Sequence, residues 1–303
     1  MRRPAKILLL LAAIAAPAYY MLVMHSPAPT APPYRIDMAE LRTLANSMPG
    51  DKPSEIRYEH VMDFAFAEAM VVAGEPWRQT LLPVYSFQLV FPDRTIIVDT
   101  AMPRAMAKPD RMVPAYHEDA YQRMLAAMDR ASQIVLTHEH MDHIGGLAEH
   151  PRLAALLPAV KLNEEQLAHP ERMRPAELPA SLFSGYEPLK YDRALAIAPG
   201  VVLLKAAGHT PGSQMVFVQR ADGRELLFLG DVAWHQHSID VQRERPLFMT
   251  LLIKEDRQQV LAQFAALQAL ASAEPDLRQV PGHDGPVMRK LVEEGLLLAG
   301  FRD

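Results

Sequence analysis

A seven-residue run, THEHMDH at residues 137–143, carries the side chains in this sequence that are best suited to chemistry. His138 and His140 are two residues apart directly after a predicted strand. Alternate residues of an extended chain point the same way, so both imidazoles can reach one ion. Asp142 and His143 follow where the chain turns into a predicted helix, and they can reach a second ion. Because neutral imidazole and carboxylate suit zinc, iron, manganese or cobalt, the run predicts a metal site.

Four other segments each place one polar side chain at the end of a predicted strand. The turn GHTPGS aims His209 into a loop, because its glycines and proline favour a tight reversal of the chain. Asp231 lies at the tip of LGD, and His283 follows the short strand that leads into PGHDG. Asp99 ends an earlier predicted strand and can brace the ligand loops from behind. Each of these signals is weaker alone than the THEHMDH run.

The order HxHxDH, GHTPGS, GD and GH resembles the metallo-β-lactamase superfamily, and the resemblance covers roughly residues 80–285. It implies a metal-dependent hydrolase with the family fold, a four-layer αββα sandwich of the α/β (α+β) class with its site at one edge. The sequence departs from the family at one turn. The family often has glycine after the early Asp-Thr pair, whereas Ala101 follows Asp99-Thr100 here. We expect this departure to alter a turn rather than the chemistry.

Position by position, the resemblance implies seven metal ligands in two sets that share one aspartate. The first set is His138, His140 and His209, the second is Asp142, His143 and His283, and the shared, bridging residue is Asp231. The expected cofactors are two divalent metal ions, Zn²⁺ in the first place, with Fe, Mn or Co as alternatives.

Two divalent ions about 3.5–4 Å apart can share a water molecule and lower its pKa toward neutrality. We therefore expect a metal-bridging hydroxide to attack an ester, a lactone or a related carbonyl or phosphoryl substrate. Asp142 or Asp231 is the expected catalytic proton shuttle. His235 and His237 follow Asp231 closely and can contact substrate or protonate the leaving group. For both we favour the plainer interpretation, an exposed pair or a pair behind the ligands.

The sequence indicates the substrate class less directly than it indicates the metal site. Asp231 is present and cysteine is absent, which favours the lactonase and glyoxalase II-like branches over true β-lactamases. The stretch Ile239–Ile253 is rich in Leu, Phe, Met and Ile, and it can form an apolar wall over the site or pack in the core. We expect a small-molecule substrate with an apolar acyl or aromatic part. The alternatives are a β-lactamase-type amide hydrolase and an iron-dependent, persulfide dioxygenase-like oxidoreductase.

The bulk composition limits the function classes. With no cysteine, the chain has no thiol nucleophile, no thiolate ligand and no disulfide. The formal net charge is −5 and no run of Lys and Arg occurs, so we expect no nucleic-acid partner.

Predicted strands and helices alternate along the chain, which indicates sheets covered by helices. The predicted strands cover 85–91, 95–99, 133–136, 201–205, 215–219, 225–229 and 279–280. The predicted helices cover 117–130, a segment after His143, 257–273 and 286–298.

The N-terminus has the layout of an export signal, with a basic start in MRRPAK and no charge over residues 7–24. Two interpretations remain open, a signal peptide cleaved after Ala16-Pro17-Ala18 and a short membrane-spanning anchor over residues 7–24. Either predicts an exported protein, periplasmic or tethered to the membrane. The prolines of SPAPTAPP favour an extended linker over residues 25–50. Residues 51–303 then form the catalytic domain.

Overall fold

The computed structural model describes residues 3–302, and for residues 3–9 and 110 it describes the backbone alone. Met1 and Arg2 of the predicted export signal therefore lie outside the described residues, as does Asp303.

The first sheet is built around a long antiparallel hairpin, β1 and β2, whose register runs from Glu55 opposite Val90 to Ala67 opposite Gln79. In spatial order its strands are β12 (Leu298–Ala299), β1 (Glu55–Ala67), β2 (Gln79–Val90), β3 (Thr95–Val98), β5 (Gln133–Val135) and β6 (Val160–Lys161), and β4 (Ala115–Tyr116) pairs with β1 outside this path. β3, β5 and β6 run parallel to one another. β3 and β5 read TIIV and QIV, almost continuously apolar, because both of their faces are covered.

The second sheet has five strands and carries the later motifs. Its spatial order is β11 (Arg278–Pro281), β10 (Glu225–Gly230), β9 (Gln214–Gln219), β8 (Val201–Lys205) and β7 (Ala194–Ala198). Neighbouring strands are antiparallel except for β10 and β11, which run parallel. The ends of β8, β10 and β11 therefore lead directly into GHTPGS, LGD and PGHDG.

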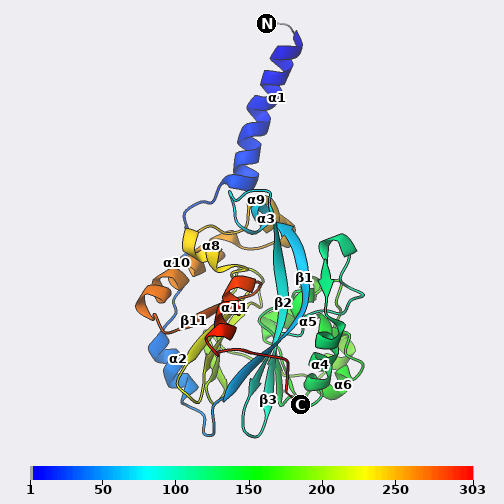
Figure 1. The fold of residues 1–303 in the computed structure, drawn as a ribbon, viewed down its shortest axis with the longest axis vertical. Coiled ribbons are helices and arrows are strands. Elements are labelled where there is room, and N and C mark those ends of the chain that lie inside the picture. The colour runs from blue at the N-terminus through cyan, green and yellow to red at the C-terminus, as the bar shows by residue number, and fades with distance from the viewer. Residues whose placement is uncertain (1–2, 303) are drawn as a thin grey trace.

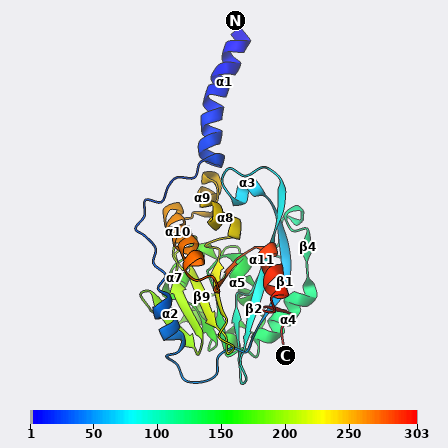
Figure 2. The ribbon, with the colours of Figure 1, turned by 60° about the vertical axis from the view of Figure 1, so that its left-hand side comes forward.

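The two sheets face each other across one apolar core, and helices cover both outer faces (Figure 2). Phe87 of β2 meets Phe228 of β10 across this core, with ring centroids 4.7 Å apart. On the outer face of the first sheet pack α4 (Glu118–Met128) and α5 (Met141–Ala148). On the outer face of the second pack α2 (Met38–Ala45) and α10 (Arg257–Ala273). The predicted four-layer αββα sandwich is confirmed.

Other helices lie in the connections between strands. They are α3 (Glu68–Val71), α6 (Leu153–Leu156), α7 (Glu164–Ala168), α8 (Gln236–Val241), α9 (Leu247–Ile253) and α11 (Gly285–Glu293), with 3₁₀ turns η2 (Asp110–Met112), η3 (Pro170–Arg172) and η4 (Ala180–Phe183). The predicted closing helix therefore ends at Glu293, and the chain after it adds β12 to the first sheet.

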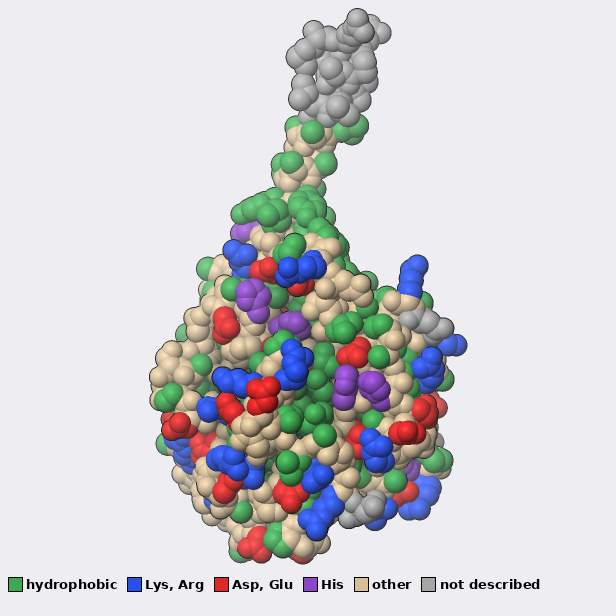
Figure 3. All heavy atoms as spheres, in the orientation of Figure 1, with side chains coloured by type: hydrophobic (Ala, Val, Ile, Leu, Met, Phe, Trp, Pro, Cys, Tyr) green, Lys and Arg blue, Asp and Glu red, His purple; other side chains and the backbone are tan. Residues whose placement is uncertain are grey.

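The N-terminal helix α1 (Arg3–Tyr19) stands away from the body of the molecule and continues into a π-helical turn, η1 (Tyr20–Met24) (Figure 1). Among the described residues, no helix combines the length and apolar character that a membrane crossing requires. Apolar side chains gather where this helix meets the body (Figure 3).

The folded part begins earlier than residue 51, where the sequence placed its start. In α2, Met38, Leu41 and Ala45 recur at helical spacing and are buried against the second sheet. Further upstream, the backbone N–H of Gly74 donates a 3.0 Å hydrogen bond to the carbonyl of Val23, whose side chain is also buried. The extended linker is thus shorter than the predicted range 25–50.

Candidate metal centre

The THEHMDH run bridges the end of β5 and the start of α5. His138 lies in the loop after β5, His140 is the residue before α5, and Asp142 and His143 lie in its first turn. The helix packs closely on the turn after β3, because Gly146 has no side chain. A Cβ at Gly146 would lie 2.0 Å from the carbonyl oxygen of Thr100. This close approach between Gly146 and Thr100 fixes the position at which α5 begins.

Asp99 braces the run from behind, as the sequence suggested. His143 Nδ1 donates a 2.9 Å hydrogen bond to Asp99 Oδ2, and the Thr137 hydroxyl donates a 2.8 Å bond to the same oxygen. The Thr137 backbone N–H donates to the other carboxylate oxygen at 2.7 Å. His143 is thereby held with Nε2 facing the site, as expected when a carboxylate orients a metal-binding imidazole.

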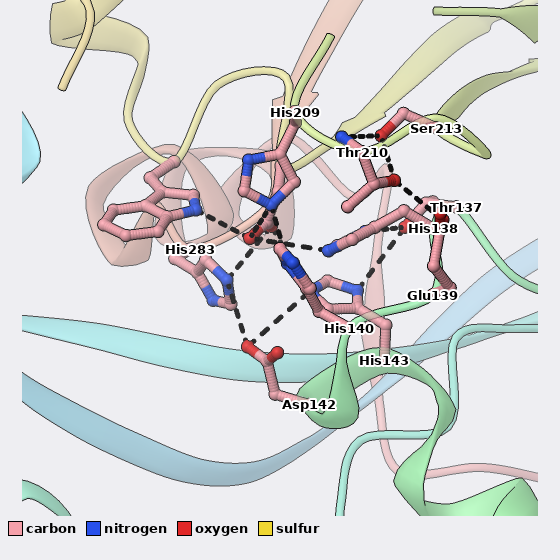
Figure 4. Close-up of polar contacts among 12 residues, drawn as sticks. Thr137, His138, Glu139, His140, Asp142, His143, His209, Thr210, Ser213 and His283 are labelled. Carbon is pink, nitrogen blue, oxygen red and sulfur yellow. Dashed lines mark hydrogen bonds and ion pairs between the residues drawn. The ribbon is translucent and has the colours of Figure 1, made fainter. Parts of the chain in front are cut away.

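The other predicted residues arrive from the second sheet at the same place (Figure 4). His209 follows β8, Asp231 follows β10 and His283 follows β11. His283 Nδ1 donates a 2.9 Å hydrogen bond to the carbonyl of Pro83 on β2, which aims its Nε2 inward.

All seven predicted ligands fall into two groups that share Asp231, and within each group the donor atoms lie within 4.8 Å of one another. The first group is His138, His140, His209 and Asp231, and the second is Asp142, His143, His283 and Asp231.

The two oxygens of Asp231 divide between these groups. Oδ2 lies 3.4 Å from Nε2 of His209 and 3.8 Å from Nε2 of His138. Oδ1 lies 3.2 Å from Nε2 of His143 and 3.1 Å from Nε2 of His283. One carboxylate therefore faces both sets, which is the arrangement that a bridging ligand requires.

Buried polar atoms without hydrogen bonds show that the site suits metal ions. Nε2 of His138, Nε2 of His143 and Oδ1 of Asp231 are all inaccessible to solvent and have no hydrogen-bond partner in the described part of the chain. Leaving such atoms unpaired costs roughly 1–3 kcal/mol each. Divalent ions would satisfy all three, and imidazole and carboxylate donors suit zinc and its neighbours.

The pKa shifts of these residues describe the charge of the site. Burial, followed by the charge of nearby histidines, holds the pKa of His138 and of His140 well below the ordinary value, so both rings are neutral donors. Burial alone would raise the pKa of Asp231, but His283 and His143 outweigh it and hold that pKa well below its usual range. For His143, burial is outweighed by Asp99 and Asp231, and the pKa is raised well above 6.5. The site thus holds an ionised carboxylate that attracts cations.

Several supporting residues escaped the sequence analysis. The Glu255 carboxylate accepts a 2.7 Å hydrogen bond from His209 Nδ1 and pairs with the buried guanidinium of Arg245. The Trp234 indole N–H donates a 2.6 Å hydrogen bond to Asp231 Oδ2. Glu139 accepts hydrogen bonds from the Thr210 hydroxyl at 2.7 Å and from the loop backbone, and so holds GHTPGS against THEHMDH.

His235 and His237 belong to neither donor group. His237 Nε2 lies 3.0 Å from the carboxylate of Glu75, and its side chain is 51% exposed. His235 is largely buried, and burial lowers its pKa. Neither is a candidate ligand, and for both the choice between a role in substrate contact or leaving-group protonation and a supporting position behind the ligands stays a prediction.

A sequence model of the metallo-beta-lactamase superfamily matches residues 80–283, a span that contains all seven candidate ligands. The chain belongs to this superfamily. It is accordingly a metal-dependent hydrolase with a His/Asp metal site.

Superfamily members with known or assigned activities resemble the chain at moderate identity. An N-acyl homoserine lactonase from Bacillus thuringiensis is 24% identical over 185 residues, covering 54% of this chain and 70% of that protein. A probable metallo-hydrolase from Mycobacterium tuberculosis is 30% identical over 173 residues, covering 50% of this chain and 54% of that protein.

Solved structures of other proteins share the fold of this chain. An N-acyl homoserine lactone hydrolase with the product N-hexanoyl-L-homoserine at its catalytic metal center has a TM-score of 0.62 at 18% identity, covering 79% of this chain and 96% of that one. A dizinc quorum-quenching lactonase in complex with a product has a TM-score of 0.53 at 13% identity, covering 78% and 92%.

In this superfamily member the metal centre opens into a cavity of about 430 Å³. His140, Asp142, His209, Asp231 and His283 lie at its base. Most of its apolar lining comes from three regions, which contribute Phe64, Phe66, Met70 and Leu82 around the β1–β2 hairpin, Met112 of η2 and Met249, Leu252 and Ile253 of α9. Met141 and Trp234, which lie close to candidate ligands in the sequence, complete it. The apolar stretch predicted as a wall therefore contributes to the cavity through α9, whereas Ile239 of α8 is buried in the core.

Proposed function

We propose that this chain is a dinuclear zinc hydrolase that cleaves lactones or esters with an apolar acyl part. The division of the two Asp231 oxygens between the two donor groups carries the dinuclear part of this proposal. Two divalent ions held there would make water nucleophilic near neutral pH and polarise a carbonyl oxygen.

Asp142 is the better placed of the two predicted proton shuttles. It lines the cavity, its side chain is 15% exposed, and within the described residues it makes no hydrogen bond, only contacts with His143 and His283 at 3.7 and 3.6 Å. Asp231 is 3% exposed and accepts the Trp234 hydrogen bond, so it is suited to a fixed position.

The proton balance then follows from ester or lactone hydrolysis. Water first loses one proton to solvent and becomes hydroxide. The hydroxide oxygen bonds to the carbonyl carbon, and its remaining proton passes to the Asp142 carboxylate. As the bond from the carbonyl carbon to the leaving oxygen breaks, Asp142 returns the proton to that oxygen. The products are a carboxylate and an alcohol, and Asp142 is ionised again.

The cavity supports the substrate class. Phenylalanine, leucine, isoleucine and methionine supply nine of its twenty lining residues, and burying an acyl chain against them gains about 0.8 kcal/mol per CH₂. Lys108, Arg174 and Lys254 also line the cavity, and these cations would favour the carboxylate that hydrolysis creates. The relatives named as N-acyl homoserine lactonases act on or bind substrates and products of this kind.

A homologous series of acyl lactones and aryl esters tests the substrate class. We expect kcat/KM to rise by up to about fourfold per added methylene, corresponding to about 0.8 kcal/mol, until the cavity is full. The same panel includes a β-lactam, which we expect to be a poorer substrate. A flat response to chain length would remove the argument from the apolar walls, and faster turnover of the β-lactam would replace the proposal with amide hydrolysis.

Metal analysis tests the dinuclear centre separately. The purified chain should hold close to two zinc ions at the candidate centre. A single tightly bound iron with no hydrolysis of any carbonyl substrate would instead favour the oxidoreductase alternative.

We also propose that the protein is exported, on the basis of the basic start and uncharged stretch of residues 1–24. Fractionation of expressing cells, with N-terminal sequencing of the product, should place the catalytic domain outside the cytoplasm. Recovery of the chain in the cytoplasm with Met1 intact would contradict this.

A further inference from the structure

A third group of metal-binding side chains lies on the first sheet, and it shares no residue with the candidate metal centre or its cavity. Its members are His60 and Asp63 of β1 and His117, which precedes α4. Their donor atoms lie within 4.8 Å of one another. His60 Nε2 is 2.9 Å from Asp63 Oδ1, and the two imidazole centroids are 4.7 Å apart.

A β-bulge explains why His60 and Asp63 face the same way. In a regular strand, residues three apart point to opposite faces of the sheet. Here His60 pairs with Tyr85 while Met62 pairs with the adjacent Val84, so β1 carries one extra residue at Val61. The extra residue re-aims the strand after it, which brings Asp63 onto the face of His60.

Backbone hydrogen bonds also fix the position of His117, the third member of the group. β4 pairs with β1 directly after the bulge, with Tyr116 opposite Met62 and Ala115 opposite Asp63. The next residue, His117, donates its backbone N–H to the carbonyl of Val61 at 2.7 Å. Hydrogen bonds within the sheet thus hold all three side chains together, independently of any ligand.

The surroundings of His60 and His117 suit a metal ion that keeps one coordination position open to water. His60 and His117 line a surface cavity of about 600 Å³, together with the carboxylates of Glu118 and Asp119. The nearby guanidinium of Arg123 is neutralised by two 2.8 Å hydrogen bonds to Glu59. Two imidazoles, one carboxylate and space for water form a donor set that zinc accepts.

We propose that His60, Asp63 and His117 bind one zinc ion in addition to those of the catalytic centre. This ion joins β1 to the start of α4 and thereby fastens the C-terminal end of the segment 102–116. That segment carries Lys108 and Met112 into the wall of the active-site cavity. The third ion is therefore a structural clamp on one wall of the substrate site.

Equilibrium dialysis of the full chain against zinc tests the stoichiometry. The substitution His117→Ala, at an exposed position, should lower the zinc content by one ion per chain relative to wild type. His237→Ala is the matched control, because His237 also contacts a carboxylate but belongs to none of the metal-binding groups of the described residues, and the zinc content of this variant should equal that of wild type. Equal zinc content in wild type and His117→Ala would overturn the proposal. The difference of one ion holds whether the catalytic centre binds one metal or two.

Limited trypsin digestion tests the clamp without measuring activity. Arg104 and Arg111 are exposed within the segment 102–116. Zinc should slow cleavage after both residues in wild type and in His237→Ala, and should have a smaller effect in His117→Ala with an unchanged circular dichroism spectrum. Equal protection of all three proteins would attribute the effect to the catalytic centre and refute the clamp.

Discussion

At the scale of single residues, His209 shows how the protein supports the candidate ligands. Its Nδ1 donates to Glu255, and Glu255 in turn pairs with Arg245, so a buried ion pair fixes the orientation of the ring. Burial would raise the pKa of Glu255, but Arg245 and His209 outweigh it and keep that pKa lowered. The carboxylate is therefore ionised at neutral pH and orients the imidazole, as outer partners of metal-binding histidines do.

The substitution Glu255→Gln should reduce metal affinity or activity by roughly 10–100-fold, the usual loss when such a partner is changed. Titration with zinc and steady-state kinetics measure the two quantities. Glu244→Gln is a matched control, because Glu244 is also buried and paired with an arginine, Arg257, but does not contact a candidate ligand. A similar loss in both variants would show that the effect is one of general stability.

The sequence predicted the candidate ligands because each is marked by a local motif. It could not predict Glu255 or Arg245, because their contacts with His209 form between segments that are distant along the chain. The sequence marks Ala101 as a departure from the family but does not give its backbone conformation. Its φ of 48° is a conformation that glycine adopts with less strain, by roughly 1–2 kcal/mol, so the turn keeps a glycine-type geometry without glycine.

At the scale of elements, the turn from β11 into α11 brings His283 to the site by close packing. Gly282 lies against Asp231, and a Cβ there would be 2.4 Å from Asp231 Oδ1. Gly285, three residues later in the same turn, has only ordinary contacts, the nearest at 3.4 Å.

Gly282→Ala should therefore displace the Asp231 carboxylate and lower zinc content and kcat together, whereas Gly285→Ala should leave both close to wild type. The expected loss is at least 10-fold in kcat/KM, since the displaced group is the shared candidate ligand. Metal analysis and kinetics on the two variants check this. Full metal content in Gly282→Ala would mean that Asp231 does not need its observed position.

Helix α9 offers a matched pair of leucines on one element. Leu252 lines the active-site cavity, whereas Leu251 does not, and both are well exposed at 71% and 64%. Leu252→Gln should lower kcat/KM for a long-chain acyl substrate by about fivefold, corresponding to about 1 kcal/mol of lost apolar contact. It should not change kcat/KM for a short-chain substrate, and Leu251→Gln should change neither. Equal effects of the two substitutions would exclude α9 from the acyl-binding wall.

The long periodic elements were predictable and the irregular ones were not. Helix α10 matches its predicted range, 257–273, and most of the predicted strands recur within a residue or two. β1 was missed because its bulge breaks the alternation of buried and exposed residues on which a strand prediction depends. The sequence leaves Ile239–Ile253 as one apolar stretch, either a wall over the site or core packing, but the chain there folds as two short helices whose packing depends on distant partners.

At the scale of the whole molecule, the segment after α1 is part of the catalytic domain. Arg257 donates to the carbonyl of His25, and the Ser26 hydroxyl donates to Glu244. Together with the bond from Gly74 to Val23, these contacts attach residues 23–26 to the body, although the sequence assigned residues 1–24 to a separate targeting segment.

Two deletions separate targeting from folding. A chain that begins at Tyr19, as cleavage after Ala18 would produce, retains these contacts and should unfold in urea like the full chain. A chain that begins at Ala28 loses the three hydrogen bonds and should lose about 2–3 kcal/mol in free energy of unfolding, from about 1 kcal/mol each. Equal stability of both shortened chains would show that residues 23–26 add nothing to the fold.

The candidate ligands and most of the cavity walls come from different elements, which has a consequence for how members of the superfamily diverge. The candidate ligands lie after β5, β8, β10 and β11, whereas most of the apolar wall residues come from the β1–β2 hairpin, η2 and α9. None of these wall segments supplies one of the seven candidate ligands. Mutations that reshape the walls can therefore accumulate under selection for new substrates while the hydrolytic centre is retained, so descendants of one ancestral chain can acquire different specificities without passing through an inactive form.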